Sequence, residues 1–385
     1  MKKILIIVLI IILTSGVIYG DGLESLINDQ IETIDIQEMQ NIIDRINAEN
    51  NNILTDLNIK NLIKSSFSNQ NVFNFKVLIK NIWRYAMTEL IINIGLLGKI
   101  IILSIFCAVF QNFHTSFQGE SIGKIAYGIC YIIIIILAMQ SFSIVSKTCF
   151  ETIDLTVTFM QSLLPILITL LLSVGGITSF SLLQPIVYTS LTVIVTFIKT
   201  IVIPMVIFSS VLSIISNISD KVRISKLASL IRGIAIALLG IILTVFTGII
   251  SIQGLASASM DGVIAKTAKF TVDNFIPIIG DFLSEAFDTV IGCTLMVKNG
   301  ISIIGLCILV FIVLLPVIKI LAIFLSYKLS AALIQPIIDN ELVQSLNDIG
   351  NSVFVLLCCM ASVGILFFIA ITIIMGIGNV SIMMR

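Results

Sequence analysis

Apolar runs of about 20 residues recur along the chain from residue 91 onward, separated by short polar segments. One such run, coiled as a helix, crosses the roughly 30 Å hydrocarbon core of a bilayer. We therefore predict an all-α fold, a polytopic membrane helical bundle of about seven or eight spans. The predicted spans are residues 91–110, 125–145, 155–174, 180–198, 201–215, 234–252, 301–325 and 353–377.

The N-terminus has a different pattern. Lys2 and Lys3 precede a short apolar run and then small residues, which is typical of a secretory signal peptide. An uncleaved membrane anchor fits the same residues. In both cases the two lysines stay in the cytosol and Asp21 emerges outside. Residues 1–20 are assigned to this signal peptide or anchor.

Residues 21–89 form a polar segment with 10 acidic and 6 basic residues. Apolar residues recur in it at helical spacing, for example at Met39, Ile42, Ile43 and Ile46. We predict a small extracytoplasmic helical domain whose apolar stripes pack on one another or on a partner. A solvated helical stalk is the alternative. Residues 90–385 form the polytopic transmembrane domain.

Charge places the loops on the two sides of the membrane. The densest basic loop of the membrane region contains Lys221, Arg223, Lys226 and Arg232, and such loops prefer the cytosol. Lys199 and Pro204 interrupt the apolar run from 180 to 215, so we predict a hairpin there. Starting outside at Glu89, five spans then place the basic loop inside. Residues 253–300 and the C-terminus lie outside on this count, and residues 327–352 lie inside.

The segment 273–296 is amphipathic. Asp281, Glu285 and Asp288 recur at i, i+4 and i+7, which places them on one face of a helix. Three such charges are costly in a lipid-spanning helix. The pattern predicts an interfacial or re-entrant helix or one that lines an aqueous cavity, and a helix lying flat on the surface remains the alternative.

Composition excludes several classes of protein. The chain is 58% hydrophobic and 11% charged with equal numbers of acidic and basic residues, which excludes a water-soluble enzyme and a nucleic-acid binder. One histidine, His114, excludes a multi-histidine metal site. The segment 95–99 lacks the spacing of a phosphate loop, and no nucleophile elbow is present. We predict no catalytic, cofactor-binding or metal site, and no enzymatic activity.

Several polar residues fall inside or beside the predicted spans. Lys319 follows Pro316, where a kink would open a polar pocket. Gln184 and Gln335 each precede a proline in similar tetrapeptides, and such breaks in two halves are a pointer to transporter repeats. Asp154 and Lys199 lie near predicted span ends, which favours snorkelling to the interface. These residues support an alternative function, an autonomous secondary transporter for a small solute or ion.

From residue 221 onward the chain resembles the stage III sporulation protein AE family of endospore-forming bacteria. The order and spacing of several apolar motifs carry the resemblance, and the N-terminal region agrees with it in architecture only. The motifs are KLASLI at 226–231, GIISIQG at 248–254, KTAKF at 266–270, NFIPIIG at 274–280, LPVIKI at 315–320 and FFIAITI at 367–373.

The resemblance implies a function. Members of the family are membrane components of a secretion-system-like channel between the mother cell and the forespore, located in the mother-cell membrane surrounding the forespore. The resemblance also implies partners, namely other membrane and ring-forming subunits and a separate cytosolic ATPase. It carries over no catalytic residue.

Overall fold

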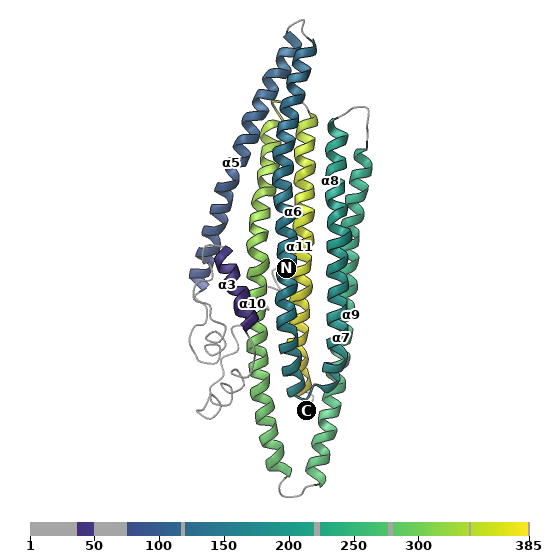
Figure 1. Ribbon diagram of the computed structural model, residues 1–385. Coiled ribbons are helices and arrows are strands. Elements are labelled where there is room, and N and C mark those ends of the chain that lie inside the picture. The colour runs from purple at the N-terminus through teal and green to yellow at the C-terminus, as the bar shows by residue number, and fades with distance from the viewer. Residues whose placement is uncertain are drawn as a thin grey trace.

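The computed structural model of the chain describes residues 37–49, 75–116, 120–218, 224–275, 280–338 and 340–383. Every regular element within these residues is a helix, and the long helices lie side by side in a tall bundle (Figure 1). Six helical stretches are long and apolar enough to cross a membrane. The predicted all-α polytopic bundle is confirmed, with six candidate spans in place of seven or eight. The elements are α3 (Gln37–Glu49), α5 (Phe75–Ser116), α6 (Glu120–Ser173), α7 (Ile177–Phe197), η1 (Ile198–Val202), α8 (Ile203–Ile218), α9 (Ser225–Phe275), α10 (Gly280–Ile334) and α11 (Asn340–Met383).

The prediction of separate spans at 125–145 and 155–174 was wrong. Both belong to α6, which runs unbroken over 54 residues. The polar stretch between them contains Lys147, Glu151 and Asp154, which lower the hydropathy without interrupting the helix. Lys and Glu are good helix formers, so a charged stretch ends an apolar run without ending the helix.

The predicted hairpin at Lys199 and Pro204 was also wrong, because α7, η1 and α8 form one continuous helical rod. Proline has no backbone N–H and breaks the i→i−4 pattern. The chain accommodates this with a π-helical turn over Ile198–Val202, in which the N–H of Ile203 donates to the carbonyl oxygen of Ile198. The rod therefore continues through Pro204.

These two corrections leave the basic loop after α8 on its predicted side and move the α6–α7 turn to the other side. Each merges two predicted spans into one, so three long helices, instead of five, precede the basic loop after α8. An odd number of crossings still carries the chain from outside to inside. The α9–α10 connection and the C-terminus stay on the predicted outer side. The α6–α7 turn, which three separate spans would place inside, follows two spans and is therefore expected outside.

The long helices exceed the thickness of a bilayer. At about 1.5 Å per residue, the 54 residues of α6 span about 80 Å. The α5–α6 hairpin extends past the other helices at one end of the bundle, and the α9–α10 hairpin extends past them at the opposite end (Figure 1). A large part of these helices therefore lies outside a hydrocarbon layer of about 30 Å.

Helix α11 is the centre of the bundle. In the most apolar part of α11, 67% of the residues are buried. The corresponding share is 22% in the most apolar part of α5 and also in that of α9. Close approach of its neighbours depends on glycines. A Cβ on Gly364 of α11 would lie 2.7 Å from Val313 of α10, and one on Gly254 of α9 would lie 2.6 Å from Ile373 of α11. Glycine at these positions lets the helix backbones approach closely.

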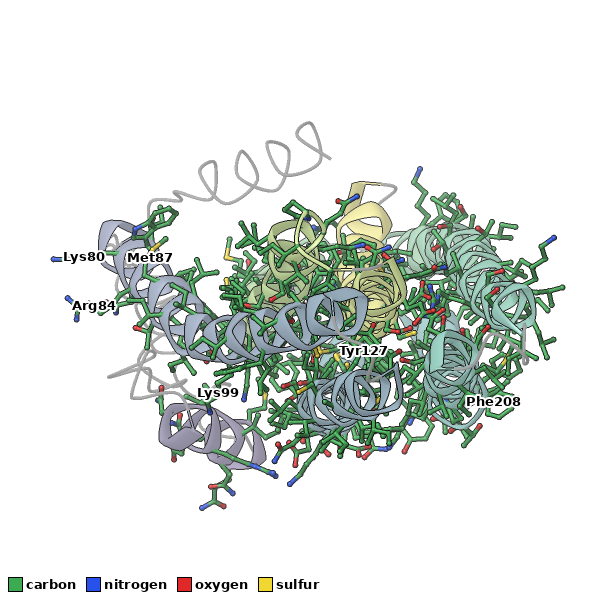
Figure 2. The ribbon with its side chains drawn as sticks, turned by 90° about the horizontal axis from the view of Figure 1, so that it is seen from above. Lys80, Arg84, Met87, Lys99, Tyr127 and Phe208 are labelled. Carbon is green, nitrogen blue, oxygen red and sulfur yellow. The ribbon has the colours of Figure 1, made fainter. Side chains whose placement is uncertain are left out.

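The N-terminal part of the described chain packs on the outside of this centre. α5 begins at Phe75 and has no break near residue 89, where the predicted ectodomain ends. Seen along the bundle, its first turns, with Lys80 and Arg84, lie at the periphery (Figure 2). The short α3 buries Met39 and Ile43 and contacts α6. The apolar stripe predicted on this segment thus packs against the membrane domain.

A tight turn joins α6 to α7. Gly175 adopts φ 86°, a conformation that favours glycine. A Cβ on Gly176 would lie 2.9 Å from the carbonyl oxygen of Leu171. Gly176 offers no side chain to cap α7. Asp261 of α9 does so instead: the N–H of Thr178 and of Ser179 donate to its two carboxylate oxygens at 2.8 and 3.1 Å.

Replacing Asp261 with alanine is expected to destabilise the start of α7. The exposed fraction of Asp261 is 1%, so its loss leaves two N–H groups without an acceptor in a place where water has little access. The cost is about 1–3 kcal/mol. Hydrogen exchange at Thr178 and Ser179 in detergent should speed up, while Lys266→Ala, at an exposed position of the same helix, should leave it unchanged. Unchanged exchange in D261A would disprove the capping role.

Candidate functional site

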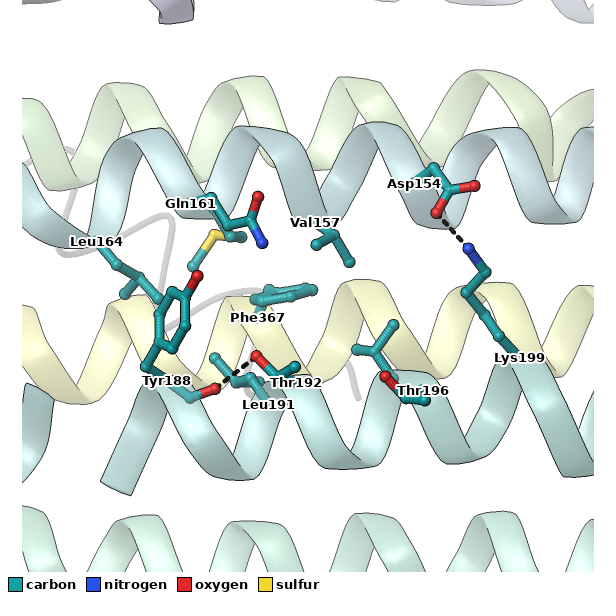
Figure 3. A pocket seen from close by; sticks show the side chains of 12 residues that line it. Asp154, Val157, Gln161, Leu164, Tyr188, Leu191, Thr192, Thr196, Lys199 and Phe367 are labelled. Carbon is teal, nitrogen blue, oxygen red and sulfur yellow. Dashed lines mark hydrogen bonds and ion pairs between the residues drawn. The ribbon is translucent and has the colours of Figure 1, made fainter. Parts of the chain in front are cut away.

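A pocket of about 220 Å³ lies between α6 and α7, with Phe367 of α11 at its base (Figure 3). One wall carries Asp154 and Gln161 of α6, and the other carries Tyr188 and Lys199 from α7 and η1. The remaining lining residues are Val157, Met160, Leu164, Leu191, Thr192, Val195 and Thr196. Charged, amide and hydroxyl groups therefore meet at one edge of an otherwise apolar bundle.

An ion pair connects the two walls of this pocket. The Nζ of Lys199 donates to Oδ1 of Asp154, as Figure 3 shows. The predicted span ends at these two residues are absent, because both residues lie inside continuous helices, and the two side chains pair with each other. Lys199 belongs to the π turn that precedes Pro204. π turns are frequent at functional sites because they redirect a side chain within an otherwise regular helix.

A second pocket lies on the other side of α6 and contains Lys319. Its volume is about 230 Å³, and four helices line it: α3, α5, α6 and α10. Lys319 and Pro316 belong to its wall, as the predicted polar pocket at the proline requires. Arg45 of α3 and Glu151 of α6 line the same pocket. The pocket thus gathers two cations and one carboxylate at the outside of the bundle.

A half-buried polar cluster joins α8, α9, α10 and α11. Asp348 of α11 accepts a hydrogen bond of 2.6 Å from Ser213 of α8 and lies 3.7 Å from Arg232 of α9. Nearby, the Nζ of Lys328 of α10 donates to Asn347 and, at 2.7 Å, to Asn351. Arg232 therefore contributes to helix packing, in addition to its predicted place in the cytosolic basic loop.

Lys298 of α10 is fully buried. Its Nζ donates to the carbonyl oxygens of Ile374 and Met375 of α11, at 3.2 and 3.1 Å. One residue later, the side-chain amide of Asn299 donates to Asn379 at 3.0 Å. These contacts connect the first half of α10 with the last turns of α11 through polar groups.

The chain matches the family model described as Stage III sporulation protein AE over residues 57–378. It is 37% identical over 307 residues to Stage III sporulation protein AE of Bacillus subtilis (strain 168), covering 80% of this chain and 77% of the relative. The chain belongs to the stage III sporulation protein AE family. No solved structure gives a significant match.

Membership of this family makes the chain a sporulation protein, and the six apolar helices make it a membrane protein. Within the ranges that the structure describes, no group of three or more His, Cys, Asp and Glu side chains could hold a metal ion. All seven cysteines are free, and each is buried or half-buried.

The remaining predicted residues do not meet at one site. Gln184 is exposed on α7, and Gln335 is exposed in the turn after α10, so the two Gln–Pro breaks are on different elements. Lys226 is exposed on the first turn of α9. Asp281, Glu285 and Asp288 lie in the first turns of α10, which is continuous with the following span, and their side chains are outside the described residues. Lys221 and Arg223 are also outside the described residues.

Three residues that make polar contacts between helices were not identified from the sequence: Lys298, Lys328 and Asp348. The predicted spans 301–325 and 353–377 left all three in loops, whereas the candidate spans are Thr289–Ile334 and Glu341–Ile377. Apolar residues at helical spacing continue through each of the three positions. Extending each span along that periodicity would have identified them as charges inside a bundle.

Proposed function

We propose that this chain is a multi-pass membrane core component of the channel between the mother cell and the forespore, a secretion-system-like complex required during endospore formation. In this proposal it lies in the mother-cell membrane surrounding the forespore. It works with other membrane subunits, ring-forming subunits and a separate cytosolic ATPase. The chain supplies helices and surfaces to the complex and no catalytic step.

The observation that carries the proposal is the family match over residues 57–378, which spans almost the entire helical bundle. The helices support it because they are far longer than a bilayer requires and provide surfaces for partners on both sides. The polar pockets beside α6 support the proposal as well. Charged groups are costly on a surface that contacts only lipid, so charged pockets indicate contact with water or with other subunits.

The proposal predicts a specific set of partners. A tagged chain, cross-linked in sporulating cells and purified in mild detergent, should recover the ATPase and the ring-forming subunits together. A tagged polytopic membrane protein of unrelated family, produced at the same stage, is the control and should recover neither. Recovery of the chain by itself from cells that contain those subunits would contradict the proposal.

A second function, autonomous transport of a small solute or ion, is favoured by one observation. Lys319 lines a pocket together with Pro316, and helices α3, α5, α6 and α10 surround it. Ionisable residues within membrane segments often mark substrate pathways. A transporter would work without other subunits, which separates it from the channel proposal.

Transport can be tested on the purified chain in liposomes. Transporter activity predicts uptake of a solute or ion by the chain alone and at least about a tenfold loss in Lys319→Met, because a buried substrate charge would lose its partner. Lys99→Met, at an exposed position of α5, is the matched control and should retain uptake. The channel proposal predicts no uptake by the purified chain.

A further inference from the structure

The exposed face of α6 changes character along its length. In its first half the exposed side chains are mostly isoleucines, such as Ile129, Ile132 and Ile136. In its second half they are polar or charged at alternating spacings of four and three residues, which keeps them on one face of the helix. These residues are Lys147, Glu151, Asp154, Thr158 and Gln161.

The neighbouring α7 presents a second polar stripe. Ser181, Gln184, Thr192 and Thr196 are all exposed on it at helical spacing. The last two line the same pocket as Asp154 and Gln161 of α6, on the opposite wall (Figure 3). Asp154 and Gln161 of α6 and Thr192 and Thr196 of α7 therefore face one space.

This space is a trough with a defined shape. Its walls are α6 and the rod α7–η1–α8, and its floor is α11, which contacts both walls. α6 contacts α7, to which the glycine turn joins it, but makes no substantial contact with α8. The helices that form the two walls diverge from the α6–α7 turn toward the other end of the bundle, where α11 lies between them (Figure 1).

Helix α9 shows what a lipid-facing surface of this chain looks like. Between Ile234 and Ile264 its exposed residues include no charged side chain and are mainly Ile, Val and Leu. The hydroxyls on that surface bond to their own helix, as Thr244 does to the carbonyl oxygen of Gly240 at 2.8 Å. Such a helix face is compatible with hydrocarbon.

The polar groups of the trough do not fit a lipid-facing surface of this kind. Some of its hydroxyls do bond within their helix, as Thr192 does to Tyr188 at 2.8 Å, and these would tolerate lipid. The carboxylate of Asp154 and the amide of Gln161 have no equivalent arrangement, and Asp154 is 60% exposed even in its ion pair. An exposed carboxylate facing hydrocarbon costs several kcal/mol, so these groups require water or polar protein.

We propose that the α6–α7 trough is the water-facing wall of a pathway for hydrophilic solutes, with the Asp154–Lys199 pair on its surface. The inference rests on the proposed channel function and names the part of the chain that serves it. The pocket of about 220 Å³ offers carboxylate, ammonium, amide and hydroxyl groups to water, more than the two to four polar partners that one water molecule needs. The π turn at Lys199 directs that ammonium toward the opposite wall.

Thiol labelling tests the proposal. Single variants Gln161→Cys and Thr192→Cys place a thiol in the trough. Ile241→Cys and Val245→Cys place one on the exposed face of α9 as matched controls. A membrane-impermeant charged maleimide is added to vesicles that carry the cross-linked complex, and the unmodified chain gives the background of the native cysteines. The trough positions should react at least about tenfold faster, because a thiol facing hydrocarbon stays protonated.

The same samples distinguish failure of this inference from failure of the proposed function. If the partners co-purify and the trough positions react as slowly as those on α9, lipid or packed protein covers the trough, and the inference is overturned while the channel proposal stands. If no partner co-purifies from cells that contain the subunits, the channel proposal fails, and fast labelling then no longer supports a pathway within that complex. A trough variant can fail to co-purify with the partner subunits although the unmodified chain succeeds. Such a variant is replaced by Ser181→Cys or Thr196→Cys.

Discussion

Replacing Asp348 with alanine is expected to lower the free energy of unfolding by about 1–3 kcal/mol, because it removes a hydrogen-bond acceptor and an ion-pair partner from a place with little access to water. The side chains of Asp348 and Arg232 are only 18% and 13% exposed. Without the carboxylate, the guanidinium stays half-buried with no opposite charge beside it, and Ser213 loses the acceptor of its hydrogen bond. The loss can be measured by titration with dodecyl sulfate in mixed micelles.

Two variants make this prediction specific. Asp154→Ala removes a carboxylate from an exposed ion pair and should cost no more than about 1 kcal/mol. The double variant Arg232→Met with Asp348→Leu removes both charges and should recover most of the stability lost by D348A, because apolar side chains can replace a buried pair. If D348A and D154A destabilise the protein equally, the half-buried polar cluster does not hold α9 and α11 together.

Replacing Gly364 with valine is expected to separate α10 from α11 and to cost about 2 kcal/mol or more. A Cβ at this position would lie 2.7 and 3.1 Å from the two methyl carbons of Val313. Valine is branched at Cβ and has one strongly preferred rotamer in a helix, so Val313 cannot turn away from the new atoms. The helices must move apart instead. The fall in thermal stability in detergent measures the effect.

A second substitution should reverse this loss. Val313→Ala removes the two methyl groups that clash, so the double variant with Gly364→Val should be more stable than Gly364→Val by itself. Gly376→Val is the matched control on α11, because no atom lies within 4 Å of a Cβ there, and it reports the cost of placing valine in this helix. Equal losses in G364V and G376V would show that helix propensity, and not contact with α10, sets the cost.

The helices and the fold class could be predicted because long apolar runs determine both. The number of spans could not, because apolar runs mark where a helix can enter lipid and do not mark where a helix ends. Lys147, Glu151 and Asp154 ended a predicted span, yet α6 continues through them. Pro204 ended another, and one π turn was enough to accommodate it.

The candidate sites could be predicted only in part. Lys319 was singled out because a proline precedes it by three residues, which is a local signal, and both residues line a pocket. The pairs Asp154–Lys199 and Arg232–Asp348 join residues on different helices that are far apart in the sequence. No local pattern in one sequence identifies such neighbours, since they depend on which helices pack together and at what height. The sequence interpretation considered Asp154, Lys199 and Arg232 one at a time, whereas each forms an ion pair with a residue of another helix.

The cap on α7 has a consequence for how the chain is assembled in the membrane. Thr178 donates to a residue that follows it by 83 positions, on a helix that does not exist when α7 leaves the ribosome. At roughly 5–20 residues per second, at least about 4 s pass before Asp261 has been synthesised. During that interval the first turn of α7 depends on water or the insertion machinery for its hydrogen bonds. Asp261 completes the hydrogen bonds of this turn when α9 packs against α7. The α6–α7 hairpin therefore reaches its final form during translation only after the fourth long helix has been made.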